Sequence, residues 1–417
     1  MKRLFILFSI LISFSVCAQS VKTPTGQKSL DYFLQNAIQN SPLLIENKNQ
    51  IEALKYDSLR IKALYKPQVN FDNTNIYAPV INGFGYDNAI TNGGVISALV
   101  GTNLTLVGKE NLSNQFQNLH LQSQSIQLSG KLSERDLKQN ITAQYIMLYG
   151  EQEMLRNTEE VLNVLQKEDV ILKKLAEQGT YKESDYLSFL VNYKQQELSY
   201  NQRKLQLKND LALMNYTCGI PDTTYIELEK PFVERKNILS SEQTLAFKQY
   251  SIDSLILKNT FEQVKFDYKP HMKLFGDAGY NSSLAYQAQK NFGVSGGLNL
   301  VVPIYDGKQR NFRYEKLKLS EKTRTTYMQF YKKQYSQKIL QLDQQIKNTQ
   351  QLMSDAQKQL GLSDALVQAN QKFLTTGDAK MTDYILALTN YITAQSIVLQ
   401  LNISTMQLIN EFNYLNY

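Results

Sequence analysis

Long stretches of the chain place apolar residues seven positions apart, the spacing of helices that pack as coiled coils. The second half carries one unbroken series: Ile339, Ile346, Met353, Leu360, Val367 and Leu374. The first half carries a shorter one: Ile141, Leu148, Leu155 and Leu162, continuing onto Asp169 and Ala176. Neither 108–179 nor 307–377 contains a proline. Each stretch is therefore predicted to hold a helix of about 70 residues, ~105 Å long, followed by a glycine turn and a second helix, at 184–216 and 382–412.

Before each long helix the apolar spacing changes from seven to two, which indicates β-strands. We expect strands at 68–77, 95–107, 271–280 and 293–305, each of about ten residues, the length that crosses a bilayer obliquely. Aromatic residues gather near the strand ends, as in membrane barrels: Tyr77, Phe84, Tyr86, Tyr280, Tyr286, Phe292 and Tyr305. A soluble sheet with one wet face alternates in the same way, but the strand length favours the membrane.

Four strands leave two open edges, and unpaired backbone groups cost several kcal/mol each in lipid. One chain therefore cannot close a membrane barrel, and several chains must share one.

The two halves repeat one plan. Gly179 and Gly377 lie 198 positions apart, as do Asp185 and Asp383. We divide the chain into a first repeat at 19–217 with a helical hairpin at 108–216, a linker region at 218–240, and a second repeat at 241–417 with a hairpin at 307–412. The linker contains Pro221 and Pro231, which break the helical pattern.

The first 18 residues have the features of a secretory signal peptide, with two basic residues before a short apolar run. Val16 is bulkier than the residue usual before an acylated cysteine, which disfavours lipidation of Cys17. Cleavage removes Lys2 and Arg3 and lowers the net charge from +7 to +5. This weak surplus gives no case for nucleic-acid binding, and the single remaining cysteine, Cys218, cannot form an intramolecular disulfide.

The sequence contains no catalytic motif, and we predict no enzyme, no cofactor and no metal site. His120 and His271 lie outside any ligand pattern, and no serine-hydrolase, zinc-protease, phosphate-loop or paired-cysteine motif occurs.

The order of these features resembles the TolC-like outer-membrane efflux protein family. The likeness rests on Ser29-Leu30-Asp31 and Asn40-Ser41-Pro42 near the start, on Tyr65-Lys66-Pro67 before the first strand, and on Val302-Pro303-Ile304-Tyr305-Asp306-Gly307 after the last one. The resemblance implies a mainly α-helical protomer with a membrane β-barrel portion. Three chains would form a twelve-stranded barrel, continued by a coiled-coil tunnel across the periplasm.

The resemblance also implies a passive channel of an efflux pump or a type I secretion system. Such a channel conducts small molecules or proteins from a periplasmic adaptor and an inner-membrane transporter to the exterior. The two turns, at Gly179-Thr180 and Gly377-Asp378, would receive the adaptor. The alternative is a soluble periplasmic or surface coiled-coil scaffold, for which the heptads suffice.

The resemblance places an acidic gate at Asp383, where three copies would favour cations. A second acidic position of the family falls on Leu386 here, which puts a second ring in doubt. The alternative role for Asp383 is to cap or complement the start of a helix, and for Asp185 this role is the favoured one.

Overall fold

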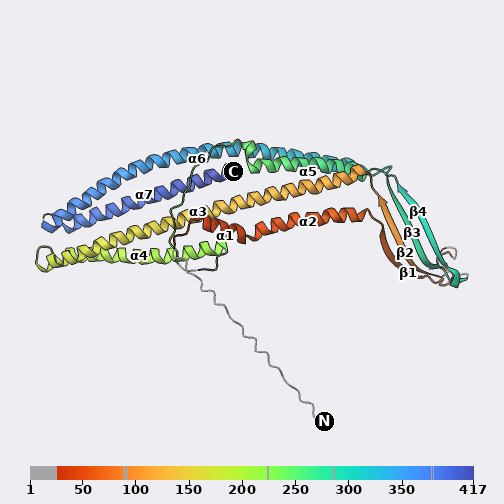
Figure 1. The fold of residues 1–417 in the computed structure, drawn as a ribbon, viewed down its shortest axis with the longest axis horizontal. Coiled ribbons are helices and arrows are strands. Elements are labelled where there is room, and N and C mark those ends of the chain that lie inside the picture. The colour runs from red at the N-terminus through yellow and green to blue at the C-terminus, as the bar shows by residue number, and fades with distance from the viewer. Residues whose placement is uncertain are drawn as a thin grey trace, which may run out of the picture.

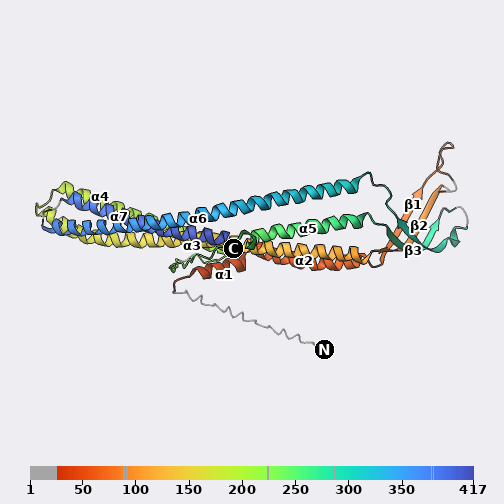
Figure 2. The same cartoon turned by 90° about the horizontal axis from the view of Figure 1, so that it is seen from above.

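The structure is a computed structural model that describes residues 26–87, 90, 93–222, 225–284, 287–376, 378 and 380–417. It is a long helical rod with a small sheet at one end (Figures 1 and 2). The expected signal peptide lies outside the described residues.

The two halves have closely matched elements. The first comprises α1 (Leu30–Asn40), α2 (Pro42–Leu64), β1 (Gln68–Tyr77), β2 (Gly94–Leu106), α3 (Lys109–Glu177) and α4 (Glu183–Cys218). The second comprises the short η1 (Ser241–Gln243), α5 (Leu245–Asp267), β3 (His271–Ser282), η2 (Ala288–Lys290), β4 (Phe292–Val301), α6 (Gln309–Thr376) and α7 (Met381–Leu415). The long helices have 69 and 68 residues, so each runs about 100 Å.

The four strands form one antiparallel sheet in the order β1-β2-β3-β4. Their register brings the apolar faces of all four strands together, because Phe71 pairs with Val100, Val100 with Ala278, and Ala278 with Val294. The opposite face is polar and includes a hydrogen bond from Ser295 Oγ to Asp277 Oδ2 of 2.7 Å. The sheet is therefore amphipathic as a whole.

Within the part of the chain that the structure describes, the apolar face of the sheet is left largely uncovered. Val69 is 68% exposed, Val294 84% and Leu298 55%. The outer strands β1 and β4 each have only one partner strand in the described chain. An uncovered apolar face with two unpaired edges is typical of a sheet that a further surface completes.

β4 ends at Val301, four residues before the predicted end at 305. His271 pairs with Val301 at the last rung, and Pro303 follows two residues later. Proline has no N–H to donate to a ladder, so the apolar alternation through Val302 and Ile304 continues outside the sheet.

The predicted seven-residue seam holds in α6 and shifts in α3. In α6, Ile339, Ile346 and Leu374 are buried. In α3 the buried positions beyond Gln152 are Val161, Leu165, Glu168 and Leu172, and the predicted position at Asp169 is only half-buried. An α-helix turns every 3.6 residues and drifts about 20° per heptad, which changes the residues that face a neighbour.

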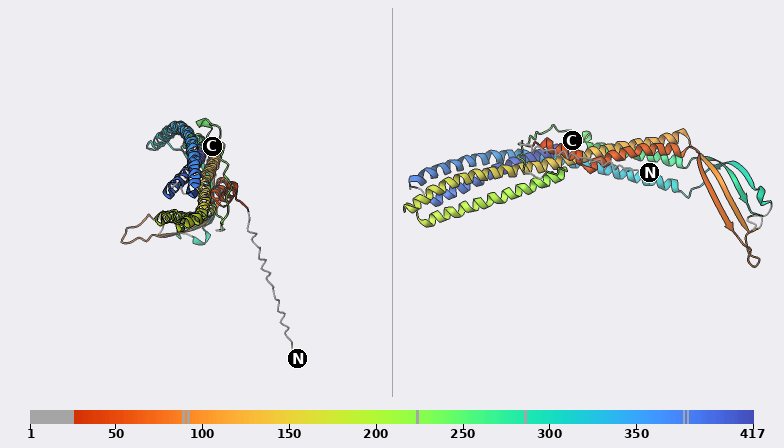
Figure 3. Two further views of the ribbon diagram at one scale, coloured as in Figure 1. Left: turned by 90° about the vertical axis from the view of Figure 1, so that its left-hand side faces the viewer. Right: turned by 60° about the horizontal axis from the view of Figure 1, so that its bottom comes forward.

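The end-on view shows the helices as a curved layer rather than a closed bundle (Figure 3). α3 packs on α4, and α6 packs on α7, so each half forms an antiparallel hairpin. The two hairpins meet mainly where α3 contacts α7. There Gly150 allows a close approach, because a Cβ at this position would lie 2.1 Å from Ile403 Cδ1.

Candidate functional site

The turns between the paired helices lie together at the end of the rod farthest from the sheet (Figure 1). The first turn has the geometry of a Schellman helix end. The Thr180 N–H donates to Leu175 O at 2.9 Å, and the Gly179 N–H donates to Ala176 O at 3.0 Å. Gly179 has φ +77°, and open space surrounds the position of a Cβ, so backbone conformation rather than crowding requires glycine.

The second turn has a hydrogen bond that corresponds to the one from Thr180. The Asp378 N–H donates to Phe373 O at 3.0 Å, again five residues back along the chain. Gly377, predicted at this turn, lies outside the described residues. Thr180 and Asp378 are both exposed. Burial first, and the charge of Asp378 second, raise the pKa of Tyr181, which indicates that the two turns are neighbours.

The predicted acidic residues Asp185 and Asp383 sit in the first turns of α4 and α7. The alternative to a gate was that each aspartate caps its helix or complements the helix dipole, and side-chain capping does not occur. The N-cap positions are Lys182 and Lys380, and no side-chain cap hydrogen bond forms at either helix. Each carboxylate stands three residues into the helix, where a negative charge complements the helix dipole. Asp383 is exposed, and Asp185 is half-buried.

A hydrophobic cluster just behind the turns joins the two hairpins. It contains Val161, Leu165, Leu172, Phe189, Leu374, Met381, Tyr384 and Leu388. The Tyr181 hydroxyl donates to Leu374 O at 2.8 Å and ties the first turn to the end of α6.

Glu168, Gln371 and Tyr384 lie at this junction and were not singled out by the sequence analysis. Gln371 Nε2 donates to Glu168 Oε1 at 2.6 Å, linking α6 to α3. The signal that points to Glu168 is its seam position: it is a carboxylate spaced between Leu165 and Leu172 in an otherwise apolar row.

The linker is held by side-chain amides that pair with its backbone. Gln152 Nε2 donates to Leu228 O at 3.0 Å, and the Leu228 N–H donates to Gln152 Oε1 at 2.7 Å. Asn413 does the same with Glu234 O at 2.7 Å and the Lys236 N–H at 2.9 Å. These amides supplement the short parallel bridge between Lys28 and Leu228 and fix the extended linker by satisfying its backbone groups.

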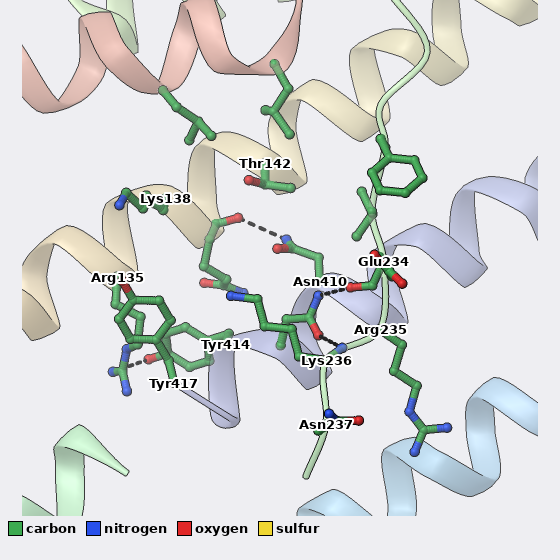
Figure 4. A pocket seen from close by; sticks show the side chains of 16 residues that line it. Arg135, Lys138, Thr142, Glu234, Arg235, Lys236, Asn237, Asn410, Tyr414 and Tyr417 are labelled. Atoms are coloured by element: carbon green, nitrogen blue, oxygen red, sulfur yellow. Dashed lines mark hydrogen bonds between the residues drawn. The ribbon is translucent and has the colours of Figure 1, made fainter. Parts of the chain in front are cut away.

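A groove of about 650 Å³ lies between this linker, α3 and the end of α7 (Figure 4). Its basic side chains are largely neutralised, because Arg135 pairs with Asp136 at 2.8 Å, Lys138 with Glu134 at 2.6 Å, and Arg235 with Asp343 at 2.7 Å. The groove is polar but close to neutral, and of these pairs only that of Arg235 with Asp343 joins the linker to a helix.

Two further observations bear on the chemistry of the chain. Within the described residues, no group of three or more His, Cys, Asp or Glu side chains is placed to hold a metal ion. None of the helices in that part of the chain is both long enough and apolar enough to cross a membrane.

Comparison with known proteins gives matches by structure alone. No family model and no curated protein sequence matches the chain. The outer-membrane channel CmeC of Campylobacter jejuni superposes with a TM-score of 0.73 at 14% identity, over 93% of this chain and 85% of CmeC. The outer-membrane protein VceC of Vibrio cholerae gives 0.71 at 12% identity, over 93% and 96%.

The open state of the outer-membrane channel MtrE of Neisseria gonorrhoeae also matches, with a TM-score of 0.71 at 11% identity over 93% of this chain and 88% of MtrE. Each match covers nearly the whole of this chain. The expected fold is therefore confirmed: the chain has the protomer fold of the TolC-like outer-membrane channels.

Proposed function

We propose that this protein is the outer-membrane channel subunit of a tripartite efflux or type I secretion system. The observation that carries the proposal is the match of 93% of the chain to the folds of outer-membrane channels. The uncovered apolar sheet face supports the membrane reading over a soluble coiled-coil scaffold. A scaffold needs the heptads but has no use for such a face.

The same sheet supports a homotrimer. Four strands from each of three chains make a twelve-stranded barrel without lipid-facing edges. The helices also carry exposed apolar stripes: Val191, Leu198 and Leu205 on α4, and Leu352, Leu366 and Phe373 on α6. The α4 residues lie seven positions apart, and the α6 residues fall on the same spacing with Gln359 at the intervening position. Within the protomer, α6 packs mainly on α7 and α4 mainly on α3. We assign these stripes to contacts between copies of the chain.

In this assembly the sheet lies in the outer membrane and the helices extend into the periplasm. The turns at Thr180 and Asp378 form the free end of the tunnel, where a periplasmic adaptor and, through it, an inner-membrane transporter would connect. Gly179 and Gly377 belong to the same docking turns. Cargo would pass without chemical change, as small molecules or as proteins.

Asp383 is proposed to form a ring of three carboxylates near the tip, since it is exposed in the first turn of α7. Such a ring attracts cations and repels anions at the entrance. Asp185 has a secondary place in this gate, because its side chain is half-buried.

Reconstitution of the purified protein into planar bilayers tests the proposal. We expect a detergent-resistant trimer, conductance, and a cation preference that Asp383→Asn lowers severalfold. Leu198→Lys is expected to abolish the trimer, whereas Leu198→Met, which preserves an apolar stripe, is expected to retain it. A monomer that remains in the soluble fraction and never conducts would establish the scaffold alternative.

A further inference from the structure

Glu168 is a buried carboxylate without a cationic partner at the junction of the two hairpins. The residue is 4% exposed and lies on α3 between Leu165 and Leu172, two members of the hydrophobic cluster behind the turns. Its Oε1 accepts one hydrogen bond, from Gln371, and its Oε2 has no partner. Among the described residues, no Lys, Arg or His nitrogen lies within 4.0 Å of this carboxylate. Burial of an unpaired charge is costly, because the surrounding protein solvates the charge less well than water does.

Tyr384 brings a second unsatisfied group to the same junction from the facing hairpin. Its side chain is 0% exposed, and its hydroxyl has no hydrogen-bond partner. Burial first, and the charge of Glu168 second, raise the pKa of this hydroxyl. Tyr384 of α7 packs in the same cluster as Leu165 and Leu172 of α3, which flank Glu168 in the sequence. A buried hydroxyl without a partner costs about 1–3 kcal/mol relative to one in water.

Both costs disappear when the hairpins separate, because water then reaches the carboxylate and the hydroxyl. Apolar contacts of the cluster and the hydrogen bond from Tyr181 to Leu374 act in the opposite direction. The packed junction is thus a balance between an apolar cluster that closes it and two polar groups that favour its opening.

We propose that Glu168 and Tyr384 form an opening element that destabilises the packed arrangement of the two hairpins at the tip. The inference rests on the proposed function, in which separation of the hairpins widens the channel entrance. Its effect is opposite to that of a residue that holds the hairpins together. Replacing such a residue weakens the packing of the hairpins, whereas replacing Glu168 or Tyr384 is expected to strengthen it.

Variants at the junction show whether these residues weaken or strengthen the packing of the hairpins. Glu168→Gln retains an acceptor for Gln371 and removes the charge, and Tyr384→Phe removes only the hydroxyl. Each is expected to lower the open fraction of reconstituted channels, by about tenfold for Glu168→Gln. Gln371→Leu removes the one described partner of the carboxylate and is expected to raise the open fraction roughly fivefold. In the double variant Glu168→Gln/Gln371→Leu the increase should be lost, because no charge is left to hydrate.

An increase in open fraction for Glu168→Gln, or no change, would overturn the opening element. Backbone hydrogen exchange in 161–172 of the purified protein gives a readout that does not need conduction: exchange should slow in Glu168→Gln and Tyr384→Phe and accelerate in Gln371→Leu. If the wild-type protein neither trimerises nor conducts, the proposed function fails. The exchange rates then decide separately whether Glu168 weakens the junction.

Discussion

Among single residues, Glu242 is expected to make a contribution to folding stability that depends on pH. A hydrogen bond from Lys332 is the largest cause that lowers the pKa of this carboxyl from 4.5 to about 2, and bonds from its own backbone and from Ser241 add to it. A lowered folded-state pKa means that the stabilisation is fully present above about pH 4.5 and is lost as the pH falls towards 2. The contact joins η1 to α6.

We therefore expect Glu242→Gln to be less stable than the wild type at pH 6, with most of this difference lost by pH 2 as the carboxylate becomes protonated. Denaturant unfolding at several pH values measures this difference. Lys332→Met is the matched control, since it removes the same contact from the other side. A stability gap that persists unchanged at pH 2 would show that Glu242 acts through something other than its charge.

Single residues were predicted from sequence only where one local rule decides their role. Gly179 follows from the need for a positive φ after a helix, and the structure places it at such a position. Asp185 and Asp383 do not cap through their side chains because the helices begin two residues before each aspartate, a boundary that composition does not fix, and only the expected position in the first turn is met. Glu168 was missed because its importance depends on a neighbouring hairpin more than 200 residues away in the sequence.

Among the elements, the contact between α3 and α7 depends on the absence of a side chain at Gly150. An added methyl group would meet Ile403 Cδ1 at 2.1 Å and Cγ1 at 3.0 Å. We expect Gly150→Ala to lower the free energy of unfolding by about 1–3 kcal/mol through overpacking, measured by denaturant titration. Adding Ile403→Val removes Cδ1 and should recover part of the loss.

Gly361 provides a control for the effect of alanine on helix propensity. It lies in α6, exposed, and a Cβ there meets nothing within 4 Å. Gly361→Ala should raise stability by about 0.5–1 kcal/mol, the ordinary gain in a helix. Equal effects at Gly150 and Gly361 would contradict a close approach of α3 and α7.

Elements were predictable where the hydrophobic period was long and regular. β1 spans the predicted 68–77, and in α6 the predicted seven-residue series includes the buried residues Ile339, Ile346 and Leu374. The seam of α3 was not predictable in full, since α3 contacts α4, α7, α5 and α2 along its length and turns a different face to each. The end of β4 was missed because apolar alternation continues past the point where Pro303 prevents pairing.

At the scale of the whole molecule, the two faces of the sheet require different surroundings. The sequence of a single strand predicts only that apolar and polar residues alternate. The register shows that the apolar residues of all four strands lie on one face of the sheet. That face has to meet lipid in the proposed assembly, while the polar face lines water. Substitution by lysine should therefore be tolerated on one face and rejected on the other, even a few residues apart in a single strand.

Leu298 and Ser295 offer this comparison within β4. Leu298 pairs with Leu274 on the apolar face, and Ser295 pairs with Asp277 on the polar face. Leu298→Lys should cost about 2–4 kcal/mol near the bilayer midplane and reduce insertion into lipid vesicles, measured by protection of the strands from protease. Ser295→Lys should insert as the wild type does, because its ammonium group remains in water near Asp277. If both variants insert equally well, the apolar face does not contact lipid, and the sheet serves an interface between proteins instead.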